Sequence, residues 1–285
     1  MKELLENPLI TQLIDISFKE DIGDGDHTSL ACIDKSEKGK SIIVAKENGI
    51  LAGVELAEYI FKKVDSDLKV SQLFADGDLI HVGDIVLEIS GSSQSILTAE
   101  RTVLNFMQRL SGVASQTKKY VDVLNGLHTR IIDTRKTTPG MRLLEKWAVK
   151  IGGGANHRIG LYDMILIKDN HVDFSGGISN AIERVQKYLI SKNLNLKIEI
   201  ETRSLDEVRQ VIDKGGVHRI MLDNFTPELI SEALAIIDGK YETEASGGIT
   251  LQTLKQFAET GVDYVSSGAL THSVKSIDLS LRAVK

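Results

Sequence analysis

The second half of the chain carries short apolar segments at nearly regular spacing, and this feature most constrains the fold. Each segment is followed by polar residues and then by a stretch with helical periodicity. Successive segments end at Glu201, Asp223, Ala245 and Ser266, in steps of 22, 22 and 21 residues. The spacing predicts repeated strand–helix units in a parallel α/β barrel. The expected strands span 130–135, 164–168, 196–201, 219–223, 241–245 and 262–266.

The first half has a different pattern. A helix is expected at 8–20, and short β-branched runs at 41–45 and 85–89 are separated by Gly/Asp turns, which predicts a small α+β domain. From Thr98 to Asn125, apolar residues recur at steps of three and four, as in an amphipathic helix that Gly126 closes. The 285 residues are enough for one or two domains.

Charge and cysteine content narrow the functional classes. The formal net charge of -6 argues against a general nucleic-acid or membrane-surface binder, which needs a basic face. The single cysteine, Cys32, excludes an intramolecular disulfide and a cysteine-rich zinc site. No segment has the roughly 20 apolar residues of a membrane span, and the N-terminus lacks the apolar core of a signal peptide. We therefore expect a cytoplasmic protein.

Basic residues are concentrated where several expected strands end. Arg135, Lys136 and Lys168 terminate apolar strands, and barrel enzymes place their active sites at that C-terminal rim. His157 and Arg158 follow a run of three glycines. Arginine pairs with two carboxylate oxygens at once and lysine supplies a point charge, so this group predicts a polyanionic substrate. Arg142, Lys146 and Lys150, spaced four apart, are instead typical of a solvated helix face.

Acidic and glycine-rich positions follow the later strands. Glu201 and Asp223 end adjacent strands, where they could hold sugar hydroxyls or Mg²⁺, although an ion pair with a nearby lysine is the structural alternative. Glu199 points to the same side as Glu201, which leaves the choice between them open. The stretches Ser246-Gly247-Gly248 and Ser267-Gly268 are typical of late barrel loops that bind phosphate through backbone N–H groups.

Seven sequence blocks, in their order, closely resemble the quinolinate phosphoribosyltransferase family over nearly the whole chain. They begin at Glu20 (EDIGDGD), Glu100 (ERTVLNFMQRLSG), Asp133 (DTRKTTPG), Asn156 (NHRIGL), Leu166 (LIKDNH), Leu222 (LDN) and Glu244 (EASGGI). Two small departures are Trp147, where another aromatic residue is common, and Val217-His218-Arg219, where the family usually has Gly-Val/Ala-Asp.

The resemblance implies an N-terminal open α/β sandwich at 1–112 and an incomplete, TIM-like α/β barrel at 113–269, with the tail from about 270 to 285 packing back on the first domain. It also implies a homodimer, possibly a higher oligomer, with an active site shared between subunits. The implied quinolinate pocket comprises Arg101, Arg135, His157, Arg158 and Lys168, with Arg101 reaching in from the partner subunit. The implied phosphoribosyl pyrophosphate site comprises Lys136, Glu201, Asp223, Ser246, Gly247, Gly248, Gly268 and His272.

The implied activity is a pentosyl transfer. The phosphoribosyl group of 5-phosphoribosyl 1-pyrophosphate moves to quinolinate with decarboxylation, which gives nicotinate mononucleotide, CO₂ and pyrophosphate in de novo NAD biosynthesis. Lys136, Glu201 and Asp223 are the expected catalytic residues, with Mg²⁺ at Glu201 and Asp223 through water or substrate and with no organic cofactor. The alternatives are a molybdenum-operon relative with another substrate, a non-catalytic phosphosugar-binding protein, and a metal-dependent lyase on a complete barrel.

Overall fold

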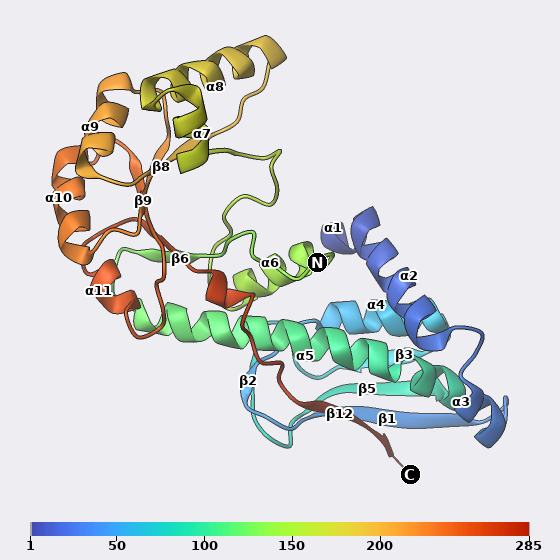
Figure 1. Cartoon of the computed structure of the whole chain (residues 1–285). Helices are drawn as coiled ribbons and strands as arrows, with labels where there is room; N and C mark the ends of the chain where they lie inside the picture. The colour runs from blue at the N-terminus through green and yellow to red at the C-terminus, as the bar shows by residue number, and fades with distance from the viewer. Residues whose placement is uncertain (1, 285) are drawn as a thin grey trace. The chain divides into compact units, whose positions relative to one another are not determined.

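The structure is a computed structural model that describes residues 2–284 (Figure 1). The chain forms two compact units. The first comprises the residues up to 118, residues 137–153 and the residues from 270 onward, and the second comprises residues 119–136 and 154–269. The domain boundary that the sequence analysis places at residue 112 is not tested by this division and stays a prediction.

The first unit is built on an antiparallel sheet with the strand order β12-β1-β5-β3. These strands are β1 (Lys38–Ala45), β3 (Lys69–Gln72), β5 (Ile85–Ser92) and β12 (Leu279–Val284). Ile43 pairs with Leu281 on one side and with Leu87 on the other, so the last strand of the chain lies beside its first. A separate small sheet pairs β2 (Gly49–Ile50) with β4 (Leu79–Ile80).

Helices complete the first unit. They are α1 (Lys2–Leu5), α2 (Pro8–Ile22), α3 (His27–Cys32), α4 (Val54–Val64), α5 (Ser93–Val123) and α6 (Arg142–Ile151). The side chain of Asn7 accepts a hydrogen bond from the backbone of Leu9, and Pro8 occupies the first turn, so both residues fix the start of α2. The helices predicted at 8–20 and 98–125 are confirmed, each starting or ending within a few residues of the prediction.

The second unit contains a six-stranded parallel sheet in the order β6-β11-β10-β9-β8-β7. Its strands are β6 (Arg130–Ile132), β7 (Ile165–Ile167), β8 (Ile198–Thr202), β9 (Arg219–Asp223), β10 (Glu242–Ser246) and β11 (Tyr264–Ser266). Among residues 2–284, no ladder joins the edge strands β6 and β7, so the barrel is incomplete as predicted. Its helices are α7 (Asp169–Ser175), α8 (Ile178–Lys192), α9 (Leu205–Lys214), α10 (Pro227–Ile237) and α11 (Leu254–Ala258), and α8 to α11 follow one side of the strands (Figure 1).

Strand alternation gives this sheet one apolar and one polar face. In β8, Ile198 and Ile200 are buried on one face, while Glu199 and Glu201 are buried on the other. Inward-facing barrel positions are usually branched apolar residues. Here several carry charge, and the C-terminal strand ends therefore present titratable groups.

Two predictions about basic residues need correction. Strand β6 ends at Ile132 rather than at residue 135, so Arg135 and Lys136 lie in the loop that follows it and not at the strand end. Lys146, interpreted as part of a solvated helix face, is only 1% exposed, whereas Lys150 is exposed. The four-residue spacing placed both lysines on one side of α6, but it could not show how far each side chain is buried.

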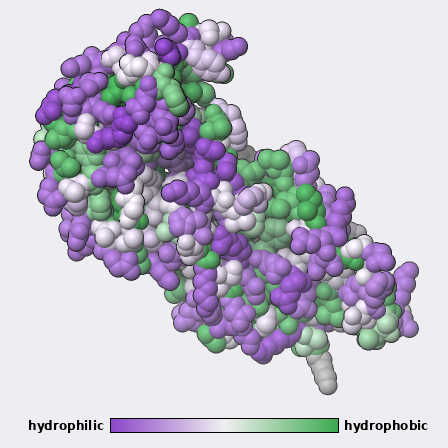
Figure 2. All heavy atoms as spheres, viewed as in Figure 1, coloured by the Kyte–Doolittle hydropathy of each residue, from purple (hydrophilic) through white to green (hydrophobic). Residues whose placement is uncertain are grey.

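Hydrophilic side chains cover most of the surface visible in Figure 2, with smaller hydrophobic areas between them. Among the described residues, no helix combines the length and the apolar character required to cross a membrane.

Candidate functional site

Lys168 and Glu201 meet at the C-terminal ends of β7 and β8. Lys168 directly follows β7 and precedes α7, and its Nζ lies 3.3 Å from Oε2 of Glu201. The Lys168 side chain is 49% exposed and that of Glu201 is 8% exposed. Burial raises the pKa of Glu201, the Lys168 charge opposes this rise, and the Asp223 charge adds to it. The two acids predicted for the sugar site therefore lie within electrostatic range of each other.

Asp223 ends β9 in a similar environment. Its Oδ2 accepts a hydrogen bond of 2.6 Å from Nδ2 of Asn224. Burial raises the pKa of Asp223, while the Asn224 bond and the charges of Lys168 and Lys136 oppose the rise. Since both lysines act on this carboxyl, the structure brings Lys136, Lys168, Glu201 and Asp223 together at one rim.

The two glycine-containing loops expected to bind phosphate also lie side by side. They follow the neighbouring strands β10 and β11, and Oγ of Ser267 donates a 3.2 Å hydrogen bond to the carbonyl of Ile249. Gly247 has a φ of +102°, and a Cβ there would approach Oδ1 of Asn224 to 2.3 Å, so a larger residue fits poorly. Gly268 begins a short 3₁₀ turn (Gly268–Leu270) after β11. Glycine-containing loops of this kind let backbone N–H groups approach an anion closely.

The segment that carries His157 and Arg158 is fixed against β6. Ala155 forms a parallel bridge with Ile132, and the buried carboxylate of Asp133 accepts a 2.9 Å hydrogen bond from the backbone N–H of His157. Arg158 is 8% exposed, and its Nη1 donates to the carbonyl of Met164 at 3.2 Å. Burial lowers the pKa of Arg158, and the nearby charge of Arg135 lowers it further. The structure thus brings the charges of Arg135 and Arg158 within electrostatic range of each other, next to His157.

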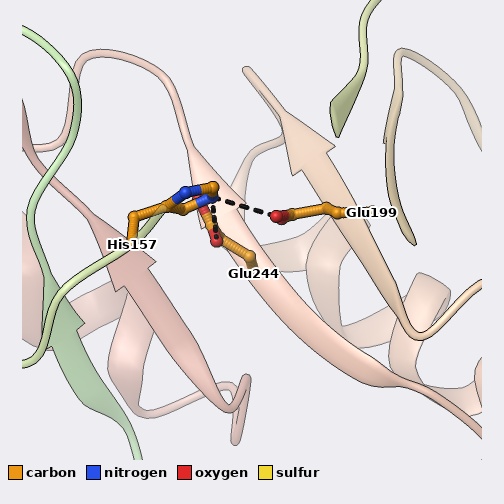
Figure 3. A group of neighbouring side chains, drawn as sticks. All are labelled: His157, Glu199 and Glu244. Carbon is orange, nitrogen blue, oxygen red and sulfur yellow. Dashed lines mark ion pairs between the residues drawn. The ribbon is translucent and has the colours of Figure 1, made fainter. Parts of the chain in front are cut away.

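A buried cluster of His157, Glu199 and Glu244 lies inside the barrel (Figure 3). Nε2 of His157 lies 2.9 Å from Oε2 of Glu199 and 3.5 Å from Oε2 of Glu244, and both carboxyls are 0% exposed. Nη1 of Arg219 lies 3.1 Å from Glu244 and 4.0 Å from Glu199. Burial raises the pKa of Glu199, and burial together with the Glu199 charge raises that of Glu244 to about 8, so the acid pair holds a proton at neutral pH.

Sequence reasoning missed Glu244 and Arg219 as members of this cluster. A signal was present, because Glu242 and Glu244 alternate along β10 as Glu199 and Glu201 do along β8. Two charged residues on the same face of a central barrel strand indicate a polar interior. The structure also separates Glu199 from Glu201, since Glu199 faces His157 while Glu201 faces Lys168.

Two acidic groups could hold a metal ion. Among residues 2–284, His157, Glu199 and Glu244 are a set of three buried side chains whose ligand atoms lie within 4.8 Å of one another. Arg219 already neutralises that set, which weakens its case as a metal site. Glu201 and Asp223 offer hard carboxylate oxygens at the strand ends, a donor type that suits Mg²⁺.

Arg101 and His272 belong to the first unit and stay predicted site residues. Arg101 is exposed on α5. His272 is exposed after the 3₁₀ turn, with Nδ1 2.5 Å from Oγ of Ser273. The other predicted residues all lie in the second unit.

Comparison with known proteins gives consistent matches along the chain. Residues 26–111 match the N-terminal domain of quinolinate phosphoribosyl transferase, and residues 113–282 match its C-terminal domain. The chloroplastic nicotinate-nucleotide pyrophosphorylase [carboxylating] of Oryza sativa subsp. japonica is 46% identical over 95% of this chain and 76% of its own length. The probable nicotinate-nucleotide pyrophosphorylase [carboxylating] of Bacillus subtilis (strain 168) is 42% identical over 95% of this chain and 92% of its own length.

Comparison with solved structures agrees with these sequence matches. The nicotinate-nucleotide pyrophosphorylase of Francisella tularensis superimposes with a TM-score of 0.92 at 39% identity, covering 99% of each chain. NadC from Streptococcus pyogenes gives 0.91 at 40% identity, covering 97% of each chain. Matches of this extent to both domains, together with the grouped cations and acids at the strand ends, show that the chain belongs to the quinolinate phosphoribosyltransferase family.

Proposed function

We propose that this chain transfers the phosphoribosyl group of 5-phosphoribosyl 1-pyrophosphate to quinolinate and releases CO₂, giving nicotinate mononucleotide and pyrophosphate in NAD biosynthesis. The observation that carries the proposal is the grouping of two kinds of charge at one rim. Arg135 and Arg158 form a cationic group suited to a dicarboxylate, while Glu201 and Asp223 lie beside Lys136 and Lys168. These groups match the two substrates that the family name implies.

Quinolinate recognition is assigned to the cationic group. Arg135 and Arg158 supply planar forks for the two carboxylates, and Lys168 supplies a further point charge. Because Arg158 is 8% exposed, its pairing with a carboxylate takes place away from bulk water and is stronger than at an open surface. In the proposed dimer, Arg101 of the partner subunit adds a further cation.

The sugar is assigned to the acidic rim. Glu201 and Asp223 accept hydrogen bonds from ribose hydroxyls, and the loops at Ser246-Gly247-Gly248 and Gly268 bind the 5'-phosphate through backbone N–H groups. His272 is a further expected ligand of this phosphate, on the family resemblance. The placement of Glu201 beside Lys168, with Glu199 held by the buried cluster, supports Glu201 as the ribose ligand.

The chemistry follows from where charge develops. The quinolinate nitrogen bonds to C1 of the ribose while the bond from C1 to pyrophosphate breaks, and C1 gains oxocarbenium character. Glu201 and Asp223 stabilise the positive charge at the sugar, and Lys136 stabilises the negative charge of the leaving group. Mg²⁺, held by Glu201 and Asp223 through water or substrate, would supply further charge neutralisation for pyrophosphate.

Decarboxylation follows from the new bond. Once the ring nitrogen carries a positive charge, CO₂ leaves and the electron pair of the broken bond stays on the adjacent ring carbon, where the positive nitrogen stabilises it until that carbon takes up a proton. No organic cofactor is needed for this step.

Three further features belong to the same proposal. The active protein is a homodimer, with domains at 1–112 and 113–269 and the tail from about 270 packed on the first domain. The antiparallel pairing of β12 with β1 supports that position of the tail. We place the enzyme in the cytoplasm.

The direct test is an assay of nicotinate mononucleotide formation from quinolinate and 5-phosphoribosyl 1-pyrophosphate, with and without Mg²⁺. We expect product and equimolar pyrophosphate only when quinolinate and Mg²⁺ are both present. Absence of product with quinolinate, alongside turnover of another acceptor, would contradict the proposal and favour the relative with a different substrate.

A second measurement separates the two substrate sites. Glu201→Ala is expected to weaken 5-phosphoribosyl 1-pyrophosphate binding more than quinolinate binding, since the proposal assigns its carboxylate to the ribose hydroxyls. Isothermal titration calorimetry with each ligand alone measures both affinities. An equal loss for the two ligands would count against the sugar role of Glu201.

A further inference from the structure

The ring of His157 has protein partners at both nitrogens. Nδ1 lies 2.7 Å from the backbone N–H of Arg158, which can only donate, so Nδ1 is the acceptor. The ring hydrogen is therefore on Nε2, which lies 2.9 Å from Glu199 and 3.5 Å from Glu244 (Figure 3). The imidazole thus spans from the backbone of its own loop to the acid pair inside the barrel.

The acid pair is itself anchored. Arg219 reaches Glu244 at 3.1 Å and Glu199 at 4.0 Å. Its guanidinium lies over the ring of Tyr264, 4.1 Å from the centroid, and Nη2 lies 3.1 Å from Glu242. Three neighbouring strands, β8, β9 and β10, therefore supply a rigid support for His157 from within the barrel.

The supported residue, His157, is followed in the chain by Arg158, a cation that must be held in place to bind the ligand. The charges of Arg135 and Arg158 repel each other in the absence of a dianion. The Arg158 backbone is held by the His157 ring, and its side chain by the Met164 carbonyl at 3.2 Å. Holding two like charges ready for a ligand lowers the cost of ordering them when the ligand binds.

The same atoms argue against a metal ion in this cluster. A metal would need the lone pair of Nε2, but that nitrogen carries the hydrogen because Nδ1 accepts from Arg158. The guanidinium of Arg219 already lies at hydrogen-bonding distance from Glu244. The cluster is therefore a support of close polar and ionic contacts rather than a metal centre.

We propose that Glu199 and Glu244 are positioning residues for quinolinate recognition, acting through His157 to hold Arg158 at the cationic pocket. This inference rests on the proposed function. His157 then supports the pocket from behind, and Arg158 and Arg135 make the direct contacts with the dicarboxylate.

A double-mutant cycle tests the proposal. Glu199→Ala and His157→Ala are each expected to weaken quinolinate binding by about tenfold, the size expected for the loss of one buried polar contact. The double variant is expected to lose about the same tenfold, because Glu199 acts through His157. Calorimetry with quinolinate and with 5-phosphoribosyl 1-pyrophosphate, each alone, measures the losses, and we expect the affinity for the sugar substrate to stay within about twofold of wild type.

Two further variants serve as controls. Glu242→Gln removes a negative charge that faces the same Arg219 without touching His157, so its quinolinate affinity is expected to match wild type. Glu199→Gln keeps an oxygen acceptor for the Nε2 hydrogen and is expected to recover most of the affinity, and it takes the place of Glu199→Ala in the cycle if the alanine variant does not fold. Additive losses, an equal loss of both ligands, or a loss in Glu242→Gln would overturn the proposal.

A spectroscopic measurement needs no variant. In wild-type protein labelled with ¹⁵N-histidine, His157 is expected to show a protonated Nε2 and an unprotonated Nδ1 at neutral pH. A protonated Nδ1 would overturn the inference without bearing on the reaction. Conversely, wild-type protein that binds no quinolinate would refute the proposed function.

Discussion

Each of the two units of this protein buries a group of charged side chains, and the two groups are satisfied differently. In the first unit, Oε1 of Glu145 accepts from Nε and Nη2 of Arg109 at 3.0 and 2.6 Å, and from Oγ1 of Thr138 at 2.8 Å. Its other oxygen accepts the Thr138 backbone N–H at 3.0 Å. In the second unit, both carboxylate oxygens of Glu199 and Oε1 of Glu244 are buried without a hydrogen bond of normal geometry to the described residues.

This difference in hydrogen bonding indicates a different role for each cluster. A buried carboxylate with both oxygens hydrogen-bonded joins segments of chain, and Arg109 also donates to the carbonyls of Thr271 and Val274. Buried polar atoms left incompletely satisfied carry a free-energy cost and in native proteins call for a functional explanation. We therefore assign the Arg109–Glu145 cluster to stability and the Glu199–Glu244 cluster to the pocket.

The largest expected effect is on the stability of the first unit. Glu145→Ala leaves Arg109 without its buried partner and should lower the free energy of unfolding by about 3–5 kcal/mol. Urea denaturation followed by circular dichroism measures the change. Lys150→Ala, an exposed position on the same helix, is the control and should leave the midpoint unchanged. A Glu145→Ala protein as stable as wild type would remove the distinction between the clusters.

The next effect is on catalysis. Arg135→Ala and Lys168→Ala should each lower kcat/KM by about 100- to 1000-fold, because each removes a cation that faces a substrate or developing charge. The fold should remain intact, since the Lys168 side chain is 49% exposed and the Arg135 residue is also exposed. Steady-state kinetics measures the loss of kcat/KM, and a thermal melt shows whether the fold is intact. Near wild-type turnover in either variant would refute its place in the pocket.

The pH dependence of the free energy of unfolding further distinguishes the Glu199–Glu244 cluster from the Arg109–Glu145 cluster. The pKa of Glu244 is raised to about 8 in the folded protein from an ordinary value of 4.5. Between these values the folded state binds more protons than the unfolded state, so this group makes stability fall as pH rises, by up to about 1.4 kcal/mol per pH unit. Glu244→Gln should flatten this part of the stability curve, measured by denaturation at pH 5, 6, 7 and 8.

The control for the pH experiment is Glu242→Gln. Glu242 contacts the same Arg219, but its side chain is 39% exposed, so we expect the slope of the wild-type curve to persist. An unchanged slope in Glu244→Gln would show that the proton resides elsewhere.

The smallest effect is expected at the surface of the second unit. Lys187 pairs with Glu183 one turn away on α8, and the two side chains are 73% and 47% exposed. Water and salt screen such a pair, so Lys187→Ala should leave the melting temperature unchanged within error. A clear loss would show that exposed charges matter here as much as buried ones.

Much of the architecture could be predicted because local patterns encode it. The regular strand spacing predicted the parallel sheet, and the periodicity after Thr98 predicted α5. The sequence blocks identified the family, which the domain matches confirm. The candidate residues Lys168, Glu201 and Asp223 were found because the carboxyl ends of parallel strands meet at one rim.

The sequence by itself determined the order of the elements, the family and which residues face the same side of a strand. Only the tertiary structure decided depth and partners. Alternation put Glu199 and Glu201 on one face, but their separate environments depend on His157 and Lys168, which arrive from other segments. Neither the burial of Lys146 nor the contact between Arg219 and Glu244 could be predicted from the sequence. Periodicity is a property of neighbouring residues, whereas the solvation of a charge depends on all the chain that packs around it.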